Sequence, residues 1–161
     1  MDNQAISAEL VSDPYAGSPC LSSLAFLPGR TKQLANQDGT IEIWQAITIK
    51  LKSGSLTLAT KENEDFLLCR APADEMGQLI DNLKCLYAGK CEHFIFEPFE
   101  PSFSLCFKRV HHYGIKVEAW LDAGNASQGI HTFDALGIRF LTVNDQIALF
   151  LQDLEILFKR S

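Results

Sequence analysis

The chain has 161 residues, of which 47% are hydrophobic and 21% are charged. This composition excludes intrinsic disorder, and the length fits one domain with its own core. Fourteen Lys and Arg residues against 20 Asp and Glu residues give a net charge of −6. A nucleic-acid binder usually carries a basic footprint, so this balance predicts that nucleic acid is not a partner.

Neither a membrane span nor a targeting signal is predicted. No apolar run approaches the roughly 18 to 20 residues that cross a bilayer. The segment Met1–Ile6 has no basic region followed by an apolar one, as a secretory signal would have. The five cysteines form no C-x-x-C pair, and most stand beside large apolar residues. We therefore expect buried, reduced thiols in a cytoplasmic protein.

Residues 1–40 differ in composition from the rest of the chain. They contain three of the six prolines, many Ser, Asn and Gln residues, and one apolar cluster. This pattern predicts an irregular lead-in with one short strand near Leu24–Leu27. The remaining residues, 41–161, are predicted to form a single domain.

From residue 41 the hydrophobic pattern predicts a strand meander followed by a helix. Apolar and polar residues alternate over residues 41–51, which indicates a strand with one buried face. Shorter strands are predicted over residues 55–60 and 66–70. Pro72 then precedes an apolar stripe with helical spacing, which predicts a helix over residues 73–88.

The second half of the chain repeats this order of elements. Strands are predicted over residues 92–97, 102–108, 113–121, 128–134 and 138–141, and a second amphipathic helix over residues 144–158. The predicted class is α+β, with antiparallel sheet in two meanders and both helices packed on one face. The two halves share no sequence motif in their strands.

No nucleotide-binding, zinc-protease or nucleophile-elbow motif is present, so the sequence predicts no enzyme and no cofactor. A metal site would have to gather His93, the pair His111 and His112, and Glu118. Adjacent residues on a strand point to opposite faces, so we expect solvated or structural histidines and no metal. Glu118 and Asp122 are four residues apart, but Lys116 shares their face, which is typical of an ordinary solvated strand.

Two tryptophans and one bend are the candidate partner-binding features. Trp44 and Trp120 are out of phase with the aliphatic face of their strands, so either residues 1–40 cover them or they lie on an interaction surface. The bend after residue 96 contains Glu97, followed by Phe99 and Glu100 between two prolines. Its phenylalanines either fill the core or form an acidic, aromatic contact element for a basic partner.

Two segments resemble the bacterial WapI-type immunity proteins. These are Met76–Leu83 in the predicted helix and Phe94–Leu105, which reads F-x-F-E-P-x-x-P-S-F-x-L. The resemblance extends over about residues 41–158. It implies a small α+β protein that binds and neutralises a cognate toxin, with no catalysis or cofactor of its own. An acidic surface suits a basic toxin domain.

The predicted function is therefore a non-catalytic protein-binding module of the immunity type. Two other functions are also compatible with the sequence. One is a structural or regulatory homodimer, and the other is a small-molecule-binding protein with a pocket between the helices and the sheet. The expected assembly is a monomer or a homodimer.

Overall fold

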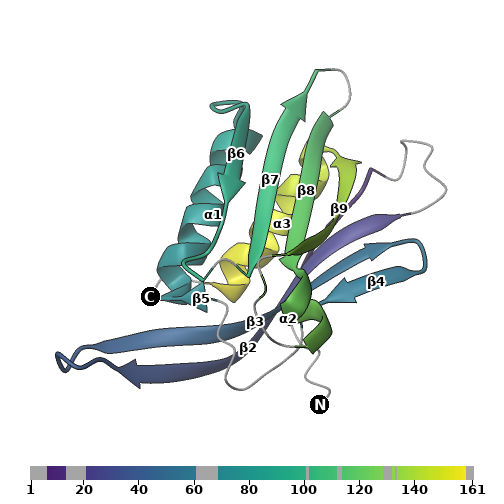
Figure 1. Cartoon of the computed structure of the whole chain (residues 1–161). Coiled ribbons are helices and arrows are strands. Elements are labelled where there is room, and N and C mark those ends of the chain that lie inside the picture. The colour runs from purple at the N-terminus through teal and green to yellow at the C-terminus, as the bar shows by residue number, and fades with distance from the viewer. Residues whose placement is uncertain are drawn as a thin grey trace, which may run out of the picture.

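The structure is a computed structural model that describes residues 7–13, 21–60, 69–100, 102–111, 114–128, 132 and 134–158. Two antiparallel sheets follow one another along the chain, and each is followed by a long helix (Figure 1). This confirms the predicted α+β class and the order of meander, helix, meander and helix. None of the described helices is long and apolar enough to span a membrane.

The first sheet has the strand order β1-β2-β3-β4, and a short β5 pairs with β3. Its strands are β1 (Ala8–Val11), β2 (Ser22–Ala35), β3 (Ile41–Ser53), β4 (Leu56–Ala59) and β5 (Cys69–Arg70). The predicted strands over residues 41–51 and 55–60 are therefore present. The prediction for residues 66–70 falls largely outside the described residues.

Residues 1–40 differ from their prediction, because β1 and the 14-residue β2 belong to the first sheet. The β2 strand passes through Pro28 and Gly29 at a β-bulge, where the pairing moves from Pro28–Ile47 to Thr31–Gln45. Proline and glycine are tolerated in a strand at such a bulge, where ladder pairing is interrupted. The far halves of β2 and β3 project from the body as a two-stranded ribbon (Figure 1, lower left).

The second sheet has the strand order β6-β7-β8-β9. Its strands are β6 (His93–Phe96), β7 (Phe103–Val110), β8 (Gly114–Asp122) and β9 (Ala135–Thr142). The strand predicted over residues 128–134 is not seen: the short helix α2 (Ala123–Gln128) ends at its start, and most of the rest lies outside the described residues. The Asp122 carboxylate accepts a hydrogen bond from the Asn125 backbone N–H at 2.8 Å, as a helix cap does.

One hydrophobic core joins both sheets to the two long helices, α1 (Pro72–Tyr87) and α3 (Asn144–Leu157). Phe26 of β2 lies at its centre, with its ring centroid 5.8 Å from that of Phe103 in β7 and 5.9 Å from that of Phe150 in α3. The sheets also meet at one edge, where the Thr142 hydroxyl donates to the Val11 carbonyl at 2.7 Å. The helices thus cover one face of the second sheet and leave its other face open (Figure 1).

Helix α1 begins after a strained residue. Ala71 has φ 43° and ψ 65°, a left-handed conformation that costs an alanine about 1 kcal/mol or more. Its N–H donates to the Ile43 carbonyl at 2.7 Å, so the strain is held by β3. Figure 1 shows β5 leading directly into this helix.

We expect Ala71→Gly to stabilise the protein by about 0.5 to 1 kcal/mol, because glycine adopts positive φ without a Cβ clash. The measurement is the free energy of unfolding from urea titration. Ala73→Gly, two residues later and inside the helix, is the matched control and should destabilise by about 0.5 to 1 kcal/mol. Equal losses from both substitutions would contradict the left-handed assignment.

Candidate functional site

The open face of the second sheet is the candidate site. Along β7, β8 and β9, residues with buried side chains alternate with residues that point away from the helices. We call the surface formed by the latter the outward face. In cross-strand rows it consists of His93, Lys108, Lys116 and Leu141; Ile95, Cys106, Glu118 and Arg139; and Ser104, Trp120 and Gly137. None of these residues is buried.

The charge of the outward face is opposite to that of the whole chain. It carries three cations, Lys108, Lys116 and Arg139, and one carboxylate, Glu118, so its local charge is +2 while the chain carries −6. Lys108 and Lys116 lie directly opposite each other on β7 and β8. Local potential, and not net charge, acts on a ligand that approaches this face.

Glu118 connects the polar residues of the outward face. Its Oε1 atom lies 2.7 Å from Lys116 Nζ and 3.9 Å from Arg139 Nη1. The hydrogen bond from Lys116 lowers the pKa of Glu118, and the charges of Lys116 and Arg139 and a hydrogen bond from Trp120 lower that pKa further. The carboxylate is therefore ionised at neutral pH and pairs with both cations.

Trp120 lies against a glycine that no larger residue could replace. Gly137 is its cross-strand partner, and a Cβ built there would lie 2.3 Å from the Ala119 carbonyl oxygen and 2.7 Å from the indole atom Cε3. The ring therefore rests on bare backbone, and 40% of the residue stays exposed to solvent. This makes a fixed, accessible aromatic surface beside the three cations.

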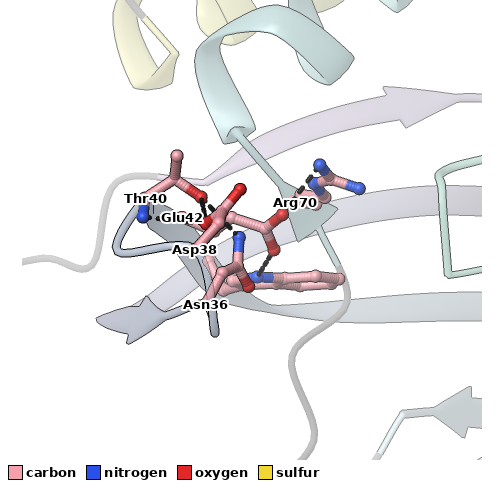
Figure 2. A network of polar contacts seen from close by, with 6 residues as sticks. Asn36, Asp38, Thr40, Glu42 and Arg70 are labelled. Carbon is pink, nitrogen blue, oxygen red and sulfur yellow. Dashed lines mark hydrogen bonds and ion pairs between the residues drawn. The ribbon is translucent and has the colours of Figure 1, made fainter.

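Trp44 lies in a different place and is buried, with 8% exposure. Its indole N–H donates to Glu42 Oε2 at 3.0 Å, and Glu42 Oε1 pairs with Arg70 Nη2 at 2.8 Å (Figure 2). The Arg70 guanidinium lies 4.6 Å above the ring centroid of Phe99, which in turn meets Trp44 edge-on at 6.4 Å. Among the described residues, Trp44 thus has Phe99 and Arg70 packed around it, and Lys32 of β2 is its cross-strand partner.

The turn between β2 and β3 extends this polar cluster. The Asn36 amide donates to the Thr40 hydroxyl at 3.0 Å, and Thr40 donates to Asp38 Oδ1 from its hydroxyl at 2.6 Å (Figure 2). A hydrogen bond from Asn36 is the largest cause of a lowered pKa for Glu42, with contributions from Trp44 and Arg70. Of these contacts, the Glu42–Arg70 ion pair links the ribbon to β5, and the others lie within the ribbon.

This lowered pKa predicts a pH effect on stability. A carboxyl with a depressed pKa in the folded state contributes stability above its unfolded pKa, and that contribution is lost as pH falls through the folded pKa. We expect Glu42→Gln to reduce the loss of stability between about pH 5 and about pH 3. Urea unfolding at several pH values measures it. Glu97→Gln removes one carboxylate from the exposed bend and should leave the profile close to that of the wild type.

The other predicted partner-binding residues lie apart from the outward face. Phe99 is 63% exposed, although its ring packs on Arg70 and Trp44. Its backbone N–H donates to Glu75 Oε1 at 2.5 Å, which fixes the bend to α1. Glu97 and Glu100 are exposed on the same bend. Of the five predicted residues, the structure brings Trp44 and Phe99 together and places Trp120 on the outward face.

Sequence reasoning missed the basic residues of this face. The strand pattern does contain the signal, because Lys108, Lys116 and Arg139 all alternate with core residues. Of the three, only Lys116 enters the sequence-based interpretation, as part of an ordinary solvated strand. Among the described residues, no group of three or more His, Cys, Asp or Glu side chains is placed to hold a metal ion.

No family model and no curated protein sequence matches this chain. Three solved structures are similar in fold over most of its length. WHY1 from Arabidopsis thaliana is 10% identical, with a TM-score of 0.44 over 95% of this chain and 82% of that one. The plant transcriptional regulator PBF-2 is 8% identical, with a TM-score of 0.46 over 98% of this chain and 82% of that one. WHY3 from Arabidopsis thaliana is 12% identical, with a TM-score of 0.43 over 98% of this chain and 89% of that one.

Two predictions from the sequence are corrected here. The predicted function as a protein-binding module that neutralises a toxin is corrected: the three solved structures named above are WHY1, PBF-2 and WHY3, and none of these three is a bacterial immunity protein. The exclusion of nucleic acid is corrected as well, because it rested on net charge and the outward face carries three cations. The choice of a basic toxin as partner is corrected together with the toxin-neutralising function. The physical error was to equate net charge with local charge, since an acidic chain presents a face with three cations.

Proposed function

We propose that this protein is a non-catalytic binder of single-stranded nucleic acid and that the strand lies on the outward face of the second sheet. The observation that carries the proposal is the indole of Trp120, packed on Gly137 and exposed on the same face as Arg139 in the next cross-strand row and Lys108 and Lys116 in the row after it. Base stacking on an aromatic ring and phosphate contact with cations are the two components of this kind of binding.

The geometry favours a single strand over a duplex. A base can stack on an exposed indole only when that base is not already stacked on its neighbours in a double helix. Four antiparallel strands that carry aromatic and basic side chains on one open face are a recurring platform for unpaired bases. A duplex would present phosphates to the cations but no base to Trp120.

The cations indicate how strongly salt should weaken binding. Three cations allow at most three phosphate contacts in a single strand, so the slope of the logarithm of the association constant against the logarithm of the salt concentration should be no steeper than roughly −2. The face is small and includes a carboxylate, so we expect modest affinity that depends on low or physiological salt. Stacking should supply the part of the free energy that remains at high salt.

Fluorescence titration with an oligothymidylate of about 12 nucleotides tests the proposal, since that length spans a typical site. We expect quenching of Trp120, weaker binding to a duplex of equal length, and the salt slope given above. An oligouridylate tests RNA, and inorganic polyphosphate tests charge alone. Absence of binding to both oligonucleotides at low salt, or equal binding to polyphosphate without quenching, would overturn the proposal.

A further inference from the structure

We propose that Glu118 is an electrostatic brake on this surface: it occupies the cations that a phosphate would bind and so limits the affinity for the strand. The inference rests on the proposed function and concerns regulation of the same site. Glu118 is the single acidic side chain in the rows that make up the outward face. The next acidic residue of the same phase in β8, Asp122, is buried and caps α2 instead.

The position of the Glu118 carboxylate makes it compete with a phosphate for Lys116 and Arg139. One oxygen, Oε1, faces both Lys116 at 2.7 Å and Arg139 at 3.9 Å. Glu118 and Arg139 are direct cross-strand partners, and Lys116 is two residues away on the same face of β8. A phosphate that contacts either cation must approach this oxygen, so it replaces an existing ion pair and is repelled by the charge that remains.

Solvent weakens this repulsion only in part. The Glu118 side chain is 22% exposed, whereas that of Arg139 is 69% exposed. The carboxylate is therefore the less exposed member of the pair, and its charge acts on the face from a partly exposed position where water screens it incompletely. Its lowered pKa keeps this charge in place throughout the neutral range.

Glu118 is not required to keep the surface in shape. The opposite faces of β7, β8 and β9 are buried in the core, which fixes the strands. Trp120 packs on Gly137, and a glutamine at position 118 keeps a side-chain oxygen that can accept the hydrogen bond from Trp120. Ion pairs at solvent-exposed positions contribute little to stability, so a neutral residue at position 118 should leave the fold intact.

The test compares three variants with the wild type in titrations of an oligothymidylate over a range of salt. Glu118→Gln removes the charge, Glu118→Asp keeps it, and Glu155→Gln removes an equal charge from the Lys84–Glu155 ion pair between the helices. Removal of a charge about 6 Å from a phosphate is expected to tighten binding by roughly tenfold at low salt. The salt slope should steepen by about 0.7 for each additional phosphate that the freed cations bind.

The two controls separate local charge from other effects. Glu155→Gln should stay within about twofold of the wild type at each salt concentration, and Glu118→Asp should bind more weakly than Glu118→Gln because it keeps the negative charge. Unchanged or weaker binding by Glu118→Gln, with the wild type still binding and quenched, would overturn the brake and leave the proposed function standing. Absence of binding by the wild type and by Glu118→Gln alike would overturn both.

Discussion

Trp120→Ala is expected to weaken binding of an oligothymidylate by roughly 10- to 100-fold, because stacking of one base on an aromatic side chain contributes about 1 to 3 kcal/mol. The loss should persist at high salt, since stacking does not depend on counterions. The salt slope should stay the same, because Lys108, Lys116 and Arg139 are untouched. Fluorescence anisotropy of a labelled oligonucleotide measures both quantities without using the tryptophan signal.

The chain offers a matched control in its other tryptophan. Trp44 is buried against Phe99 and lies apart from the outward face, so Trp44→Phe should bind like the wild type. That variant also leaves Trp120 as the single indole, so that any quenching on binding is assigned without ambiguity. Trp120→Phe keeps an aromatic ring and should retain part of the affinity. Affinity of Trp120→Ala within about twofold of the wild type would show that no base stacks there.

Phe26→Ala is expected to lower the free energy of unfolding by about 3 to 5 kcal/mol, a large fraction of the stability of a small domain. Phe26 is fully buried, and its ring contacts Phe103 of the second sheet and Phe150 of α3. Alanine would leave a cavity between the first sheet, the second sheet and α3. These packed elements are too rigid to move together and fill it.

Urea unfolding measures this loss, and two variants calibrate it. Phe26→Leu keeps most of the volume and should cost about 1 to 2 kcal/mol. Phe99→Ala removes the same ring from an exposed position and should cost less than Phe26→Ala. Equal losses at positions 26 and 99 would mean that Phe26 does not join the two sheets.

The helices were predictable because their signals are local. The apolar stripe after Pro72 and the one after Asn144 need only the 3.6-residue period, and both long helices lie within a residue or two of their predicted bounds. The strands with strict alternation, such as residues 41–51, were predictable for the same reason. One local feature, β2, was missed because Pro28 and Gly29 indicate a break in a sequence, while a bulge accommodates both in the structure.

The candidate site was less predictable because it depends on pairing between strands. Lys108, Lys116 and Arg139 are up to 31 positions apart, and only the register of β7, β8 and β9 places them on one surface. Trp44 and Trp120 have the same pattern in the sequence. One is buried, because Phe99 and Arg70 reach it from other segments, and the other is exposed.

Gly137 has no side chain, and this affects both the pairing of β8 with β9 and the position of Trp120. A methyl group there would strike the Ala119 carbonyl of the adjoining strand and the underside of the indole. The pairing of β8 with β9 and the seating of Trp120 would then be disturbed together. The exposed surface of Trp120 therefore cannot be changed at position 137 without also changing the strand pairing beneath it.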